Sequence, residues 1–156
     1  MKQKIGNLLC AIGKALGAVC LEKEESIEES QLVSYGTINI NLMSSILLDK
    51  LEDMNCTGEI YLPDNDCKTY TKNSVSDHYS LVEISGITYL PEEHDCDDFA
   101  ALLFGDFAGL VWTNTHALNW FIDENETLWF VEPQTGQLAL TLEDWQGDNI
   151  RFFIGR

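Results

Sequence analysis

The stretch Asp95-Cys96-Asp97-Asp98-Phe99-Ala100 decides how this chain is interpreted, because it places a cysteine where an apolar helix begins. Asp95 is a typical N-cap residue, and Asp98, three residues later, can return a hydrogen bond to the cap. Cys96 then lies in the first helical turn, where free backbone N–H groups and the helix dipole favour a thiolate. We expect this helix to extend from Cys96 to about Phe107.

The three aspartates beside the sulfur oppose that activation. Asp95, Asp97 and Asp98 lie within one turn of Cys96, and each negative charge raises the pKa of a neighbouring thiol. Each such charge is worth on the order of 1 kcal/mol near a surface, comparable to the dipole. Because clustered carboxylates are the ligands that hard cations prefer, we expect a Ca²⁺-type site at Asp97 and Asp98, with Asp95 as a further ligand. Simple N-terminal capping is the alternative.

Two extended segments in the last third of the chain predict a hairpin. Residues 115–122 and 127–132 alternate in character, and a polar run separates them. A hairpin folded about residue 124 makes His116 face Glu132 and Trp120 face Leu128, on one face of the sheet. Directly opposed side chains have Cβ atoms about 4.5–5.5 Å apart, so a carboxylate can hold an imidazole N–H there. Gln134 continues the same face.

Cys96, His116 and Glu132 together form a set of residues with a recognisable chemistry. A thiol nucleophile needs a base to remove its proton and a third group to orient that base. Cys96 matches the nucleophile, His116 the base and Glu132 the orienting group. The alternative for His116 is an ordinary half-buried histidine with a satisfied partner.

The composition narrows the class of protein. At 156 residues, 45% of them hydrophobic, the chain predicts one folded domain over residues 1–156. The net charge of −17 repels phosphate, so we expect no nucleic-acid partner and no anionic-membrane partner. Five scattered cysteines predict no disulfide framework and favour a reducing compartment, so we expect a cytoplasmic or virion-associated protein without a signal peptide.

The order of the expected elements indicates an α+β fold. Residues 1–30 predict an amphipathic helix and a charged linker, and a second helix is expected from about Asn41 to Met54. Short extended segments follow at 59–62, 67–71 and 87–90, with one or two helical turns from Ser76 to Ile84. The helix at Cys96, the hairpin and a final strand over 150–154 complete the chain. Helices and a mostly antiparallel sheet in this order are typical of the α+β class.

Three motifs also resemble a known family. Residues 95–100, His116-Ala117-Leu118-Asn119-Trp120 and residues 130–136 (FVEPQTG) resemble the papain-like cysteine peptidase domain of a fungal chimerolectin, the fairy-ring mushroom agglutinin. Similar domains occur in bacteriophage and bacterial proteins. The resemblance covers residues 87–156 and implies a papain-like catalytic core. It implies that Gln134 helps to polarise a carbonyl group, that Asp97 and Asp98 are the acidic pair after the cysteine, and that Ca²⁺ or Mn²⁺ is required.

Three functions are therefore expected from the sequence. The first is a cysteine hydrolase, of peptidase or acyl-transfer type, that acts on a protein or peptide substrate. The second is a papain-like scaffold without activity that serves as a phage virion or assembly component, with a virion or assembly protein as its partner, which the acidity and the short spacing of Cys96 and His116 favour. The third is a calcium-binding interaction module.

Overall fold

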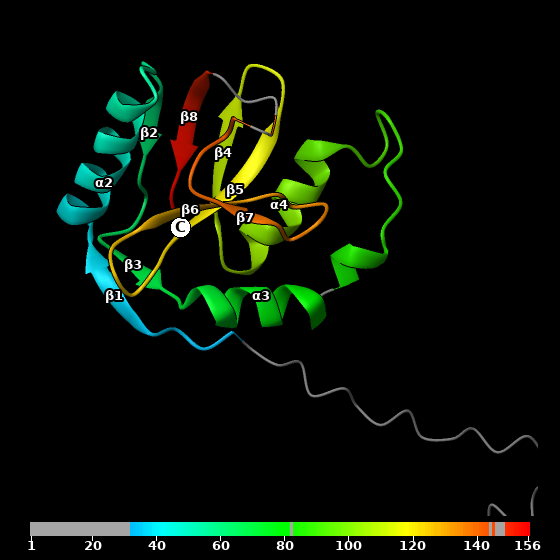
Figure 1. Ribbon diagram of the computed structural model, residues 1–156, viewed down its shortest axis with the longest axis horizontal. Helices are drawn as coiled ribbons and strands as arrows, with labels where there is room; N and C mark the ends of the chain where they lie inside the picture. Colours follow the sequence, from blue (N-terminus) through cyan, green and yellow to red (C-terminus); the bar gives the residue numbers. More distant parts are fainter. Residues whose placement is uncertain (1–31, 82, 144, 146–148) are drawn as a thin grey trace, which may run out of the picture.

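The computed structural model describes residues 32–81, 83–143, 145 and 149–156 (Figure 1). A six-stranded sheet forms its centre, in the order β2-β8-β4-β5-β6-β7, and a two-stranded sheet pairs β1 with β3. The strands of the central sheet are β2 (Glu59–Tyr61), β4 (Gly109–Thr113), β5 (Ala117–Ile122), β6 (Leu128–Val131), β7 (Leu138–Ala139) and β8 (Ile150–Ile154). The small sheet consists of β1 (Gly36–Asn39) and β3 (Asp66–Thr69). The expected α+β class is confirmed.

Helices cover both faces of the central sheet. They are α2 (Ile40–Asp53), α3 (Lys72–Leu81) and α4 (Cys96–Asp106), with a 3₁₀ turn, η1, at Glu83–Gly86. Met43, Leu47 and Leu51 of α2 pack in one apolar core, and Phe99 and Leu103 of α4 pack in a second core together with α3. The sheet therefore lies between α2 on one side and α3 with α4 on the other.

Strand β5 is the centre of this arrangement, because all six of its residues are buried. Leu118, Trp120 and Ile122 belong to the core on the α2 side, whereas Phe121 belongs to the core on the α4 side. Alternate side chains of a strand point to opposite faces, so a strand covered on both faces is apolar at almost every position. Asn119 is the polar exception.

Helix α2 begins where the sequence predicts, because Asn39 caps it. The Asn39 side chain accepts hydrogen bonds from the N–H groups of Asn41 and Leu42, at 3.0 and 3.1 Å. These bonds satisfy two of the backbone donors that every helix start leaves open. The final strand, β8, also lies at the expected residues. It pairs parallel with β2, whereas the other paired strands of the central sheet are antiparallel.

Several expected elements differ from the structure. The segment 87–90 forms no strand, because a tight turn closes on Leu90: its N–H donates to the His94 carbonyl and the His94 N–H donates back, at 3.0 and 2.8 Å. Strands β1 and β4 were not expected from the sequence, and α3 is longer than one or two turns. The expected amphipathic helix in residues 1–30 lies outside the described residues. Among those that are described, none of the helices has the length and apolar character needed to cross a bilayer.

The expected register of the hairpin was wrong by two residues. Trp120 faces Phe130 rather than Leu128. Asp123 closes the turn with Thr127: its N–H donates to the Thr127 carbonyl at 2.9 Å, and its Oδ1 accepts the N–H groups of Asn125 and Thr127, at 2.8 and 2.9 Å, so the turn is centred on residue 125 rather than 124. A slip of two residues keeps every side chain on its expected face, whereas a slip of one would have reversed them.

Candidate functional site

Cys96 is the first residue of α4, as expected, and the capping box of Asp95 and Asp98 fixes the start of that helix. The Asp95 N–H donates to Asp98 Oδ2 at 3.3 Å. Phe99 and Leu103 anchor the buried side of the helix. The cap and the apolar face together determine the direction in which Cys96 leaves the helix.

The surroundings of Cys96 make its thiol a weak acid. Burial raises its pKa, and a hydrogen bond from the Ala117 backbone acts in the opposite direction. The charges of Asp95 and Asp97 raise the pKa further. The repulsion expected from the sequence is therefore present, although burial is the larger cause. A thiol in this position needs a neighbouring base before it can act as a nucleophile.

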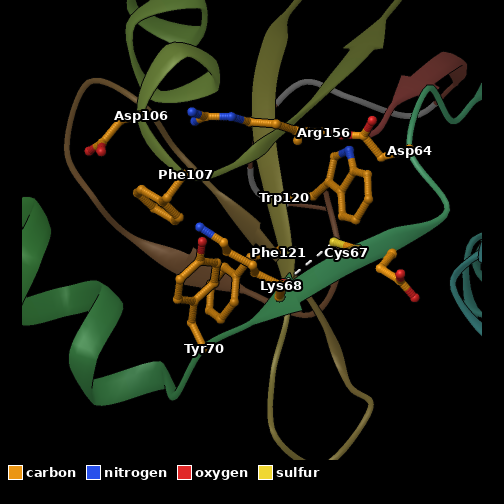
Figure 2. Close-up of a pocket in the computed structure, with 11 residues that line it drawn as sticks. Asp64, Cys67, Lys68, Tyr70, Asp106, Phe107, Trp120, Phe121 and Arg156 are labelled. Atoms are coloured by element: carbon orange, nitrogen blue, oxygen red, sulfur yellow. Dashed lines mark hydrogen bonds between the residues drawn. The ribbon is translucent and has the colours of Figure 1, made fainter. Parts of the chain in front are cut away.

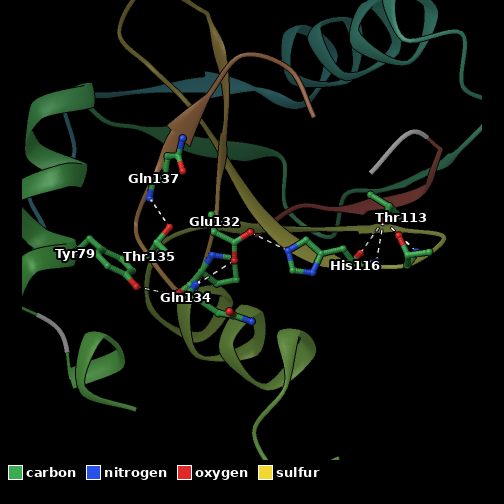
Figure 3. Close-up of polar contacts among 9 residues, drawn as sticks. Tyr79, Thr113, His116, Glu132, Gln134, Thr135 and Gln137 are labelled. Carbon is green, nitrogen blue, oxygen red and sulfur yellow. Dashed lines mark hydrogen bonds and ion pairs between the residues drawn. The ribbon is translucent and has the colours of Figure 1, made fainter. Parts of the chain in front are cut away.

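His116 is held at the start of β5 by Thr113. The Thr113 Oγ1 accepts the His116 N–H at 3.0 Å and donates to the His116 carbonyl at 3.1 Å. Thr113 is fully buried, so this clasp is protected from water. The short connection between β4 and β5 is thereby fixed, and His116 with it (Figure 3).

Glu132 binds the imidazole of His116, as expected. Its Oε2 lies 2.8 Å from Nε2, and the two side chains are only 13% and 17% exposed. A carboxylate accepts hydrogen bonds, so Nε2 carries the proton and Nδ1 is left as the basic nitrogen. The other carboxylate oxygen, Oε1, accepts the Gln134 N–H at 3.3 Å.

These groups line one pocket of about 350 Å³, which Cys96, His116, Glu132 and Gln134 share with Tyr89, Thr115 and Trp145. All four side chains that the sequence singled out as catalytic are therefore brought together. Their catalytic roles stay predictions. The sequence gave no sign that Trp145, 49 residues after Cys96, lies at the same place.

The aspartates are arranged differently from the expectation. Ligand atoms of Asp95, Cys96 and Asp97 lie within 4.8 Å of one another, whereas Asp98 is engaged in the helix cap. The pKa of Asp97 is raised by its hydrogen bond to Asp95, which shows how closely the two carboxyl groups approach. Asp95 Oδ1 is buried and has no hydrogen-bond partner. Asp95 and Asp97, rather than Asp97 and Asp98, are the pair that fits a cation.

Three supporting residues were not found from the sequence: Thr113, Tyr79 and Asn119. Tyr79 donates to the Pro133 carbonyl at 2.8 Å. Asn119 donates to the carbonyls of Ala100 and Gly109, at 2.9 and 3.0 Å, and so joins α4 to the sheet. The contacts of Tyr79 and Asn119 link residues 10 to 54 positions apart, so no local pattern signals them, whereas Thr113 lies three residues before His116. Asn119 alone gave a hint, as a polar residue inside an apolar strand.

A second pocket, of about 230 Å³, lies beside β3 and the end of α4 (Figure 2). Aromatic rings and charged side chains line it, among them Tyr70, Phe107, Phe121, Asp64, Asp106, Lys68 and Arg156. Burial raises the pKa of Cys67, in its wall, to about 11, so this cysteine is a poor nucleophile.

No family model and no curated protein matches the chain. Ten chains of solved structures do, and two of them illustrate the likeness. One is described as the PSL1a–E64 complex, at 22% identity and a TM-score of 0.62 over 76% of this chain and 50% of that one. The other is the Polyporus squamosus lectin bound to the human-type influenza-binding epitope Neu5Aca2-6Galb1-4GlcNAc, at 22% identity and a TM-score of 0.62 over 76% and 49%. The chain spans about half the length of these structures, and the likeness shows a shared fold.

These comparisons correct the function expected from the sequence. One neighbour is described as a lectin, in agreement with the fungal-lectin side of the resemblance, and neither is described as a peptidase. They contradict the assignment as a cysteine hydrolase, and they support neither a calcium-binding module nor a phage component. The sugar epitope named for one neighbour also differs from the protein or peptide substrate that was expected. The expected location in the cell stays a prediction.

Proposed function

We propose that the pocket at Cys96 is a ligand-binding site whose thiol can form one covalent bond with an electrophilic ligand. The observation that carries this proposal is the shared pocket of Cys96 and a histidine whose Nε2 is bound by Glu132 at 2.8 Å. A cysteine at a helix start that shares a pocket with a histidine at the start of a central strand is also compatible with a papain-like arrangement, and we include that finer fold in the proposal. We propose that the site binds a ligand and that the thiol can react with it once. We do not propose catalytic turnover.

The chemistry of capture follows from the positions of the protons. Because Nε2 of His116 donates to Glu132, Nδ1 can accept the thiol proton of Cys96. With an epoxide, the sulfur forms a bond to a ring carbon, and the bond from that carbon to the ring oxygen breaks. The oxygen then takes from the imidazolium the proton that came from the thiol. Gln134 lines the same pocket, and its amide N–H can donate to the developing oxygen anion.

Alkylation by E64, the compound named in one neighbour's complex, tests the proposal. We expect intact-mass spectrometry to show one adduct per chain, at Cys96, and none in Cys96→Ser. Glu132→Gln keeps the size of the side chain but weakens its hold on the imidazole, so it should slow labelling by roughly 10-fold or more. Cys67→Ser is the matched control and should label as the wild type does. Absence of an adduct, or an adduct at Cys67, refutes the proposal.

A divalent cation beside the thiol is a further part of the proposal. Asp95 and Asp97 supply clustered carboxylate oxygens, and the buried Oδ1 of Asp95 has no other partner. A bound Ca²⁺ or Mn²⁺ would offset the negative charge beside Cys96. Thermal unfolding with added Ca²⁺, Mn²⁺ or EDTA tests this, and Asp97→Asn should remove any stabilisation. Identical unfolding temperatures in all three solutions reject the cation.

Binding of a neutral sugar is the second candidate function. It is supported by the second pocket, which Asp64, Asp106 and the Tyr70 ring line together, and by the neutral Galb1-4GlcNAc part of the epitope named for one neighbour, whose Neu5Ac unit is anionic. Carboxylates accept hydroxyl hydrogen bonds, and aromatic faces pack against the apolar side of a sugar ring. The net charge of −17 disfavours anionic sugars. Calorimetric titration with neutral disaccharides tests it: binding lost in Asp64→Asn supports this function, and no heat refutes it.

A further inference from the structure

Tyr79, on α3, contacts the loop that follows Glu132. Its hydroxyl donates to the Pro133 carbonyl over 2.8 Å, and the side chain is only 6% exposed. Figure 3 shows Tyr79 and His116 on either side of Glu132. We infer that Tyr79 is a positioning residue that fixes the Glu132 carboxylate against His116, an inference that rests on the proposed function of the Cys96 site.

The loop itself forms a tight turn around the carbonyl of Glu132. The N–H groups of Thr135 and Gly136 both donate to that carbonyl, at 3.3 and 2.8 Å. Gly136 has a φ of 70°, which glycine adopts without strain. A Cβ at Gly136 would come within 2.1 Å of the Tyr79 ring, so the ring lies directly against the glycine backbone. Tyr79 therefore holds this turn at two points, through its ring at Gly136 and through its hydroxyl at Pro133.

Pro133 explains why a side chain from another element is needed. Proline has no N–H, so its carbonyl is the backbone group through which a hydrogen bond can hold it. Pro133 lies between Glu132, which binds His116, and Gln134, whose N–H donates to Glu132 Oε1. A shift of the Pro133 carbonyl would move the residues on both sides of it. The orientation of the Glu132 carboxylate therefore depends on the Tyr79 hydroxyl.

The Tyr79 hydroxyl is suited to this role because it stays protonated. Burial raises the pKa of Tyr79 to about 12, and the nearby charge of Glu132 raises it as well. The group is therefore a hydrogen-bond donor throughout the neutral pH range. It holds the loop without exchanging a proton with the pocket.

Tyr79→Phe tests the inference, because it removes the hydroxyl and keeps the ring against Gly136. Two properties are measured. The first is the NMR signal of the proton on Nε2 of His116, which reports its hydrogen bond to Glu132, and the second is the rate of E64 alkylation at Cys96. We expect the signal to move upfield or to broaden by faster exchange, and the rate to fall roughly 10-fold. Tyr70→Phe is the matched control, since Tyr70 is 5% exposed and lines the other pocket.

The outcomes separate this inference from the proposed function. An unchanged His116 signal and an unchanged alkylation rate in Tyr79→Phe overturn the inference, even if the variant is less stable. A wild-type Cys96 that does not react with E64 overturns the proposed function, and the NMR signal still decides the role of Tyr79. If Tyr79→Phe does not fold, the wild type decides: a slowly exchanging Tyr79 hydroxyl proton supports the inference, and a freely exchanging one overturns it.

Discussion

Asn119→Ala should lower the free energy of unfolding strongly, because the Asn119 side chain connects β5 to two other elements. Asn119 is fully buried, and its Nδ2 donates to the Ala100 carbonyl of α4 and to the Gly109 carbonyl of β4, at 2.9 and 3.0 Å. The one side chain thus joins the helix that carries Cys96 to two strands of the sheet. Asn119→Ala removes both donors and leaves two carbonyl groups with fewer partners.

The magnitude follows from those two groups. Each buried acceptor that loses its donor costs about 1–3 kcal/mol, so the two together cost roughly 2–6 kcal/mol. The Asn119 Oδ1 is itself buried without a hydrogen-bond partner, so its removal returns on the order of 1 kcal/mol or more. We therefore expect the free energy of unfolding to fall by about 2–4 kcal/mol. For a domain of this size, that is a drop in Tm of roughly 5–15 °C.

Urea unfolding followed by tryptophan fluorescence measures this change, since the chain contains four tryptophans. The matched control is Asn114→Ala: Asn114 is exposed, so its replacement should change the free energy by no more than about 0.5 kcal/mol. An Asn119→Ala variant that loses under about 1 kcal/mol, with an unchanged m-value, would refute the reasoning. It would mean that other donors or water take over the two carbonyls.

Three further predictions concern single contacts. Thr113→Val keeps the shape but loses the clasp on His116, so it should cost about 1–3 kcal/mol in urea unfolding and slow E64 labelling; equal labelling would show that the clasp does not position the ring. Gly109→Ala would bring a Cβ within 2.2 Å of the Trp120 indole and should cost about 1–3 kcal/mol, with altered tryptophan fluorescence. The pKa of Tyr79, raised to about 12 from its ordinary 10.0, gives stability that is full below pH 10 and lost as the pH rises toward 12. Allowing for solvent screening, that loss is about 1–2 kcal/mol, and Tyr79→Phe should lack it in unfolding measured from pH 8 to pH 11.

Several predictions from local sequence patterns were accurate. Asn39 and Asp95 each precede a helix that begins within one residue of its expected start. The last strand was also placed correctly, at Ile150–Ile154. Caps and hydrophobic periodicity act over a few residues, so they can be recognised in the sequence without knowledge of the fold.

Other predictions from local patterns were less accurate, because turns closed by a few hydrogen bonds moved the boundaries of the strands. The strand expected at 87–90 is a turn that closes through His94, and the hairpin register moved by two residues because of Asp123. The approach of His116 to Glu132 was still anticipated correctly, since an even slip preserves the face of each strand. The expected hydrolase function, which rested on the pattern of Cys96, His116 and Glu132 and on a family resemblance, was wrong, since one structural neighbour is described as a lectin and neither as a hydrolase.

The sequence by itself determined the helix start at Cys96, the acidic surface and the buried strand that ends in the Asp123 turn, because charge, capping and periodicity are local properties. Tertiary structure decided how Glu132 and α4 are held: Tyr79 reaches Pro133 across 54 residues, and Asn119 reaches Ala100 across 19. The physical reason is that such contacts depend on how the helices pack on the two faces of the sheet. The residues that a side chain contacts through this packing lie elsewhere in the sequence, so a local pattern does not reveal them.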